Sequence, residues 1–133
     1  MKFLTLNTHS WMEENPQQKF EDLLKDILAK QYDVICFQEI NQTIESPVVP
    51  VNDLYHPTPS AEPIHQDHYV RCLVEKLEEE GLSYHWTWAY NHIGYDRYHE
   101  GVAILSRTPI QASELLVSDV NDPTDYHTRR IAI

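Results

Sequence analysis

Residues 33–39 of this 133-residue chain read Asp-Val-Ile-Cys-Phe-Gln-Glu, four apolar residues in a row between polar ones. The apolar run, with two β-branched residues and one aromatic residue, predicts a strand that is buried on both faces and ends at Gln38 and Glu39. In open α/β sheets, ligands and catalytic groups gather at the carboxyl ends of the strands. A lone glutamate after a strand is more often the start of a solvated loop, so the functional interpretation of Glu39 depends on a second strand.

A second strand precedes this one, and a helix lies between them. Residues 2–7 alternate loosely and predict a short strand that ends at Asn7. Residues 16–30 start with a proline after the N-cap candidate Asn15, and their apolar residues recur at helical spacing. A strand–helix–strand unit makes a right-handed crossover between parallel strands. Because parallel strands end at the same edge of a sheet, we expect Asn7 and Glu39 to lie close together.

The rest of the chain predicts one more helix and several strands. Residues 41–65 contain five prolines and should form a long loop, which in a compact domain is either mobile or functional. Helical spacing returns over residues 65–80 and stops at Gly81. The remaining expected elements are strands over residues 84–90, 101–106, 110–117 and 126–133, and a polar, aromatic loop over residues 91–100.

The composition is that of one folded domain with a single core. Ten basic residues against 21 acidic ones give a formal net charge of −11, which argues against non-specific binding of nucleic acid. Cys36 and Cys72 suggest neither a disulfide framework nor a zinc site. No window of the sequence approaches the ~18 apolar residues of a transmembrane helix. These features favour a cytoplasmic protein.

Three motifs follow one another along the chain: Leu-Thr-Leu-Asn at residues 4–7, Ile-Cys-Phe-Gln-Glu at residues 35–39 and Glu-Gly-Val-Ala-Ile-Leu-Ser-Arg at residues 100–107. In this order and spacing they resemble the endonuclease/exonuclease/phosphatase superfamily, which has the DNase I-like fold. The resemblance covers the whole chain, but only as the first half of the family's pattern. It implies an α/β fold in which a mixed sheet of about six strands carries helices on one face, as half of a four-layer αββα sandwich.

The resemblance also implies an active site. In the family, the asparagine of the first strand and the glutamate of the Gln-Glu motif lie in the active site, the glutamate as a ligand of a catalytic Mg²⁺ ion. The matching positions are Asn7 and Glu39, which we expect to be catalytic and to hold Mg²⁺, with Mn²⁺ as the alternative ion. Glu100 resembles the acidic residue with which some members orient a catalytic histidine, and is the third catalytic candidate.

Further residues are candidates for contacts with the substrate. Tyr98 and His99 can contact a phosphate or another part of the substrate, although aromatic loops beside a sheet often only cover its end. Arg130 and its neighbour Arg129 can reach a phosphate with forked donors, although adjacent arginines on an edge strand are more often solvated. The negative charge favours a small phosphorylated molecule or a lipid head group as partner, with a DNA or RNA nuclease as the alternative.

Parts of the family's pattern are missing from the sequence: a Gly-Asp-x-Asn motif, a histidine on a middle strand and a closing Asp-His pair. We therefore expect residues 1–133 to be the amino-terminal half of a phosphoesterase domain. The whole domain would hydrolyse phosphodiesters or phosphomonoesters by metal-assisted, in-line attack of water, and this half alone would be inactive. Its uncovered sheet face should be apolar and promote self-association. A non-catalytic α/β interaction module that carries the same motifs is the alternative of another class.

Overall fold

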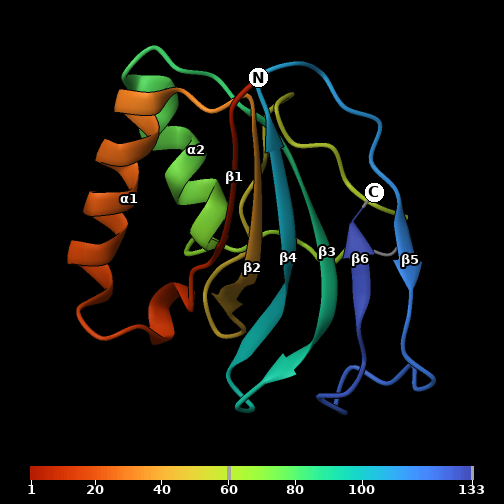
Figure 1. Ribbon diagram of the computed structural model, residues 1–133. Coiled ribbons are helices and arrows are strands. Elements are labelled where there is room, and N and C mark those ends of the chain that lie inside the picture. The colour runs from red at the N-terminus through yellow and green to blue at the C-terminus, as the bar shows by residue number, and fades with distance from the viewer. Residues whose placement is uncertain (60, 133) are drawn as a thin grey trace.

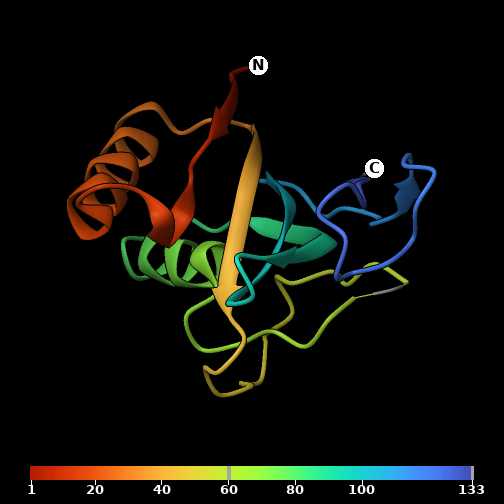
Figure 2. The ribbon, with the colours of Figure 1, turned by 90° about the horizontal axis from the view of Figure 1, so that it is seen from below.

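A computed structural model describes residues 1–59 and 61–132 of the chain. Its main sheet has the strand order β1-β2-β4-β3, and helices cover one of its faces while a two-stranded ribbon lies on the other side (Figures 1 and 2). The elements of the sheet and its helices are β1 (Phe3–Asn7), α1 (Pro16–Lys30), β2 (Val34–Thr43), α2 (Tyr69–Glu79), β3 (His85–Gly94) and β4 (Tyr98–Ser106). The ribbon consists of β5 (Glu114–Leu116) and β6 (Arg130–Ala132). The expected α/β fold, with helices on one face of a mixed sheet, is confirmed. The sheet has four strands rather than about six, and the other two strands of the described residues form the ribbon.

The first βαβ unit forms as the sequence predicts. Strands β1 and β2 are parallel, and Asn7 at the end of β1 lies opposite Gln38 of β2. Helix α1 has the expected bounds and Pro16 in its first turn. Asn15 takes the predicted N-cap position with φ 53°, although its side chain makes no capping hydrogen bond.

Strand β2 differs from its prediction in length and shape. It does not end at Glu39 but continues to Thr43, and its pairing with β4 shifts register between Phe37 and Ile40. The shift marks a β-bulge, in which Glu39 has φ 55°. The strand is also not buried on both faces: Phe37 is buried toward the helices, whereas Cys36 on the other face is half-buried.

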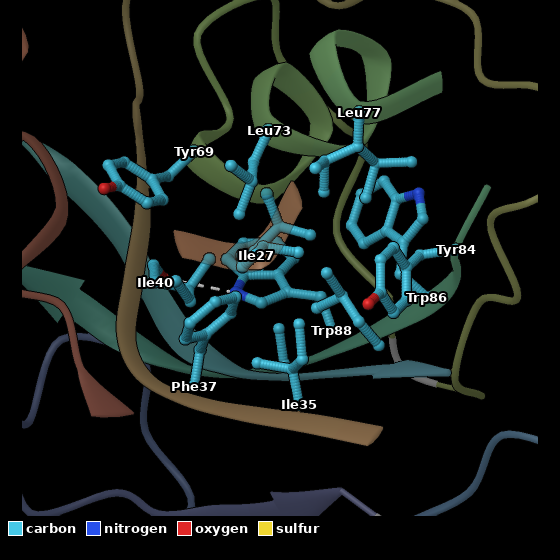
Figure 3. Close-up of a cluster of buried hydrophobic side chains, with 14 of the residues drawn as sticks. Ile27, Ile35, Phe37, Ile40, Tyr69, Leu73, Leu77, Tyr84, Trp86 and Trp88 are labelled. Atoms are coloured by element: carbon cyan, nitrogen blue, oxygen red, sulfur yellow. Dashed lines mark hydrogen bonds between the residues drawn. The ribbon is translucent and has the colours of Figure 1, made fainter. Parts of the chain in front are cut away.

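The hydrophobic core lies between the helices and the sheet (Figure 3). Its side chains come from both helices and from the three longer strands: Ile27, Ile35, Phe37, Ile40, Tyr69, Leu73, Leu77, Trp86, Trp88, Ala103 and Leu105. The Trp88 indole of β3 reaches across β4, and its N–H donates to the Ile40 carbonyl of β2 at 3.2 Å. Gly101 makes this crossing possible, because a Cβ at that position would overlap the Ala89 carbonyl oxygen and would lie 2.9 Å from Trp88 Nε1.

Several predicted boundaries are wrong. The expected loop over residues 91–100 is mostly a hairpin, because β3 runs to Gly94 and β4 starts at Tyr98. Its polar residues pair within the sheet, so their polarity does not indicate a loop. The long connection runs over residues 44–68, because β2 takes residues 41–43, and α2 starts only after the N-cap residue His68. The last two expected strands shorten to β5 and β6.

The ribbon lies against the face of the main sheet that we expected to be uncovered, with β6 next to β3 and β4 (Figures 1 and 2). Among the described helices, none has the length and apolar character needed to cross a bilayer.

Candidate active site

A cavity of about 360 Å³ opens between the main sheet and β6. Four of the residues predicted from the sequence line it: Asn7 at the end of β1, Glu39 at the bulge of β2, Glu100 of β4 and Arg130 of β6. Residues far apart in the sequence therefore meet at one place on the sheet. Its other polar lining residues are Gln38, Asn91, His92 and Arg129.

The end of β1 and the bulge of β2 are held together by the loop that follows β1. The Thr8 amide donates to the Gln38 carbonyl at 3.1 Å, and the Ser10 hydroxyl donates to the Glu39 carbonyl at 2.7 Å. These bonds support a glutamate in the left-handed region, which is uncommon for a residue with a Cβ. Bulges turn side chains in new directions beside active sites. The bulge thus leaves the Glu39 carboxylate partly exposed at the cavity.

Glu100 is paired with a histidine that the sequence analysis did not single out. His92 lies opposite Glu100 on β3, and its Nε2 is 3.2 Å from Glu100 Oε2, with both side chains largely buried. On its other side, His92 Nδ1 lies 2.9 Å from Arg129 Nη1. The same Nδ1 also lies 3.2 Å from the Thr128 carbonyl oxygen, which can only accept, whereas Arg129 can only donate. In the tautomer whose Nδ1 accepts from Arg129, Nε2 carries the proton and donates to Glu100. Only the register of the β3–β4 hairpin could have revealed this pair, and residues 91–100 were expected to be a loop.

Buried polar atoms without a partner lie in the wall behind this pair. Asn41 is directly opposite Glu100 in the β2–β4 pairing. Among the described residues, neither polar atom of the Asn41 side chain has a hydrogen-bond partner, nor does Glu100 Oε1. Buried polar groups are normally satisfied, so such atoms indicate a place for water, an ion or a ligand.

The two arginines are held by the protein rather than freely solvated. Arg130 is half-buried, and its guanidinium donates to the Tyr90 carbonyl at 3.1 Å and to Asn121 Oδ1 at 2.8 Å. Arg129 is exposed as a residue, but its guanidinium contacts His92 and the Thr128 carbonyl. Their guanidinium groups therefore have a defined position beside the cavity.

Tyr98 and His99 do not line this cavity. Tyr98 lies in a neighbouring groove of about 690 Å³, which also contains His9 and Glu39, and Arg97 stacks over its ring at 5.4 Å. His99 bonds to Gln42 at 3.1 Å within the sheet, and burial lowers its pKa. Tyr98 thus lies on the other side of Glu39 from the cavity. His99 is packed within the sheet and does not face the cavity.

The donor atoms around Glu39 fit a divalent ion in part. Within residues 1–59 and 61–132, no group of three or more His, Cys, Asp or Glu side chains has the arrangement of a closed metal site. Mg²⁺, however, usually keeps several waters and takes only one or two protein carboxylates together with phosphate oxygens. The accessible Glu39 carboxylate, which lines one cavity together with Asn7, suits such an open site.

Comparisons with known proteins concern the family and the fold of the chain. Residues 10–132 match the Endonuclease/Exonuclease/phosphatase family, whose members are generally hydrolases and typically use divalent metal ions. The structure of an endonuclease/exonuclease/phosphatase family protein from Leptotrichia buccalis C-1013-b is similar, with a TM-score of 0.84 and 34% identity, over 99% of this chain and 48% of that one. Human Protein turtle homolog B is 26% identical over 145 residues, which cover 100% of this chain and 11% of that protein. The chain thus spans less than half the length of each of these two proteins. With its DNase I-like fold, the chain belongs to the Endonuclease/Exonuclease/phosphatase family.

Proposed function

We propose that this chain forms the Glu39-bearing half of the active site of a divalent-metal-dependent phosphoesterase. The observation that carries the proposal is the meeting of Asn7, Glu39, Glu100 and Arg130 at one cavity of about 360 Å³. A carboxylate and an amide oxygen on one side can bind a cation, and a guanidinium group on the other can bind phosphate oxygens. A phosphate ester needs both kinds of contact.

Each residue has a role that follows from its surroundings. Glu39 and Asn7 would hold the ion, which when bound neutralises charge on the phosphoryl oxygens. Arg130 and Arg129 would orient the phosphate, since each guanidinium has five donors and uses only some of them within the protein. His92 fixes the carboxylate of Glu100 through one oxygen, and the other, buried oxygen can accept a hydrogen bond from an internal water.

The proposal includes a division of the active site within a longer domain. The chain covers 48% of the related solved structure and lacks the Gly-Asp-x-Asn motif and the closing Asp-His pair expected of the family. Residues 1–133 would therefore bind the cation without turning over phosphoesters. The missing acidic residues and general base would come from the rest of the domain.

The charge supports a small substrate. With a formal net charge of −11, the chain repels a polyanion more strongly than a single phosphate group. The substrate class we propose is a small phosphorylated molecule or a lipid head group, and cleavage of DNA or RNA is the alternative outcome of the test.

Calorimetric titration with MgCl₂ and MnCl₂ tests the cation site. Glu39→Gln should weaken binding by more than about tenfold, because the neutral amide no longer offers a charged ligand. Glu78→Gln is the matched control, since Glu78 is an exposed acid on α2 away from the cavity. Equal affinity in the wild type and Glu39→Gln would contradict the site and favour an interaction module.

Activity assays test the division and the substrate. Residues 1–133 should not hydrolyse bis-p-nitrophenyl phosphate or p-nitrophenyl phosphate with Mg²⁺, whereas a longer protein that contains them should, and should lose activity on Glu39→Gln. Clear turnover by residues 1–133 alone would contradict the division. Faster cleavage of plasmid DNA than of any small ester by the longer protein would replace the proposed substrate class by nucleic acid.

A further inference from the structure

His9, in the loop after β1, lies between two carboxylates. Its Nε2 is 3.6 Å from Glu39 Oε2, and its Nδ1 is 3.1 Å from Glu13 Oε2. All three side chains reach solvent, with exposed fractions of 52% for His9, 39% for Glu39 and 28% for Glu13. The groove of about 690 Å³ opens directly onto His9 and Glu39. The three side chains are therefore accessible to an ion from solution.

The two contacts of the His9 ring differ in kind. The 3.1 Å contact with Glu13 has hydrogen-bond length, whereas 3.6 Å to Glu39 is too long for a hydrogen bond. Two ligands of one first-row metal ion, each bonded at about 2.1 Å, lie roughly 3.0–3.5 Å from each other. The separation between His9 and Glu39 is thus close to that of two ligands on one ion.

Glu13 supplies a hydrogen-bond acceptor for the ring nitrogen of His9 that faces away from Glu39. Ligating histidines almost always donate their second ring N–H to a carboxylate, a carbonyl or a water, which fixes the tautomer. Glu13 Oε2 lies 3.1 Å from His9 Nδ1, within hydrogen-bond distance, so Glu13 can accept that second ring N–H. With Nδ1 donating to Glu13, the lone pair of His9 Nε2 is left on the side of Glu39.

The backbone holds His9 in this position. His9 has φ 53°, its amide donates to Asn7 Oδ1 at 3.2 Å, and its carbonyl accepts from Met12 at 3.0 Å. The turn therefore connects His9 directly to the asparagine of the candidate site. A non-glycine residue in the left-handed region is uncommon, so the turn constrains where the ring can lie.

We propose that His9 Nε2 and Glu39 Oε2 are two ligands of one divalent cation and that Glu13 orients the His9 ring from behind. The proposal rests on the proposed function, because it takes the cation to bind at Glu39, and it adds the class of ion. An imidazole next to a carboxylate favours ions such as Co²⁺ and Zn²⁺ over Mg²⁺, which prefers oxygen ligands alone. Waters and a substrate phosphate fill the other positions.

Titration of residues 1–133 with CoCl₂ and with MgCl₂ tests the ligand set. His9→Asn keeps a residue that tolerates φ 53° and removes the imidazole, so it should weaken Co²⁺ binding by at least about tenfold and change Mg²⁺ binding little. Glu13→Gln keeps the ring but loses the orienting charge, and should weaken Co²⁺ binding by about tenfold. In the Co²⁺-loaded chain, proton NMR should show a hyperfine-shifted, exchangeable imidazole N–H signal that His9→Asn removes.

Two other histidine pairs give matched controls. His127 Nδ1 lies 2.8 Å from Asp125 Oδ1 in an exposed loop, and His56 Nε2 lies 2.9 Å from His85 Nδ1. His127→Asn and His56→Asn should leave the Co²⁺ affinity of the Glu39 site and the shifted N–H signal unchanged. Far-UV circular dichroism of each variant checks that the fold is kept.

The outcomes separate this inference from the proposed function. If Glu39→Gln weakens both ions but His9→Asn leaves the ratio of Co²⁺ to Mg²⁺ affinity as in the wild type, the histidine ligand is wrong and the proposed function stands. If Glu39→Gln changes neither affinity, both are wrong. Absence of the shifted N–H signal from the Co²⁺-loaded wild type would also overturn the histidine ligand.

Discussion

The two faces of the main sheet differ in what covers them. Toward the helices, Trp88 (Figure 3) and Leu105 are fully buried in an apolar core. Away from the helices, the sheet carries Glu39 at the bulge of β2 and the His92–Glu100 pair of β3 and β4 beside a cavity. The first face supplies the free energy of folding, and the second holds polar groups at some cost to it. A substitution on one face should therefore affect stability, and a substitution on the other should affect binding.

The largest expected contrast lies between two adjacent residues of β4. Leu105→Ala should lower the free energy of unfolding by roughly 3–5 kcal/mol, because it leaves a cavity in the core under the helices. Ile104→Ala, on the opposite and half-exposed face, should cost about 1 kcal/mol. Urea unfolding measures both. Equal losses would mean that the second face is as much a core as the first.

Two glycines of the hairpin give the next contrast. Gly101→Ala should cost about 3 kcal/mol, since the new Cβ would overlap the Ala89 carbonyl and the Trp88 indole that crosses the sheet. Gly94→Ala is the control, because its Cβ would meet Glu100 only at an ordinary contact distance of 3.7 Å. In thermal unfolding, the Tm of Gly101→Ala should be clearly lower than the Tm of Gly94→Ala. The reverse order would exclude the proposed reason for glycine in the Glu-Gly-Val-Ala-Ile motif.

The polar face should show one larger stability effect. His92→Ala should lower the free energy of unfolding by about 2 kcal/mol, because it leaves the largely buried Glu100 carboxylate without its partner. Glu100→Gln should cost less, since the amide can still bond to His92. Unfolding of His92→Ala, of Glu100→Ala and of the double variant that combines them measures the coupling of the two side chains, because each of these changes removes the contact. Additive losses would show that the two side chains do not interact.

The helix face should contribute a pH dependence through one buried ring. Burial is the main cause that lowers the pKa of His68 to about 3, from its ordinary value of 6.5, with smaller effects of Arg71 and His65. Below pH 6.5 the unfolded chain binds a proton that the folded chain does not. Stability is therefore lost as the pH falls, by up to about 1.4 kcal/mol per pH unit, until the folded pKa is reached.

His68→Asn tests this dependence, because asparagine keeps the capping acceptor for the Arg71 amide but does not titrate. Between pH 7 and pH 5, the free energy of unfolding measured with urea should fall less in the variant than in the wild type. His99, whose pKa burial also lowers, stays in both proteins, so the difference isolates His68. Parallel losses in the two proteins would contradict a neutral, buried His68.

The parts of the fold that the sequence predicts well are those with local signals. Apolar spacing gives the bounds of α1, and the handedness of the βαβ unit is enough to bring Asn7 beside the Gln38–Glu39 segment. The bulge is different, because Glu39 takes its conformation from the pairing of β2 with β4 and from the Ser10 bond, not from its own preference.

The parts of the site that the sequence analysis missed depend on contacts between distant residues. His92 belongs to the site only because the register of the β3–β4 hairpin places it opposite Glu100. His9 is a candidate ligand only because the turn after β1 places its ring between Glu13 and Glu39. His99 is next to Glu100 in sequence and is one of the expected contacts of the substrate. Successive residues of a strand face opposite sides of the sheet, so His99 points away from the cavity and bonds to Gln42.

Crystals of residues 1–133 soaked in Mn²⁺ would test the central claim most directly, through an anomalous difference map. We predict a peak at the bulge of β2, within roughly 2.2 Å of the Glu39 carboxylate and next to Asn7 and His9. The peak should vanish in Glu39→Gln crystals under the same soak. Peaks confined to other acidic residues, with none at Glu39, would contradict the account.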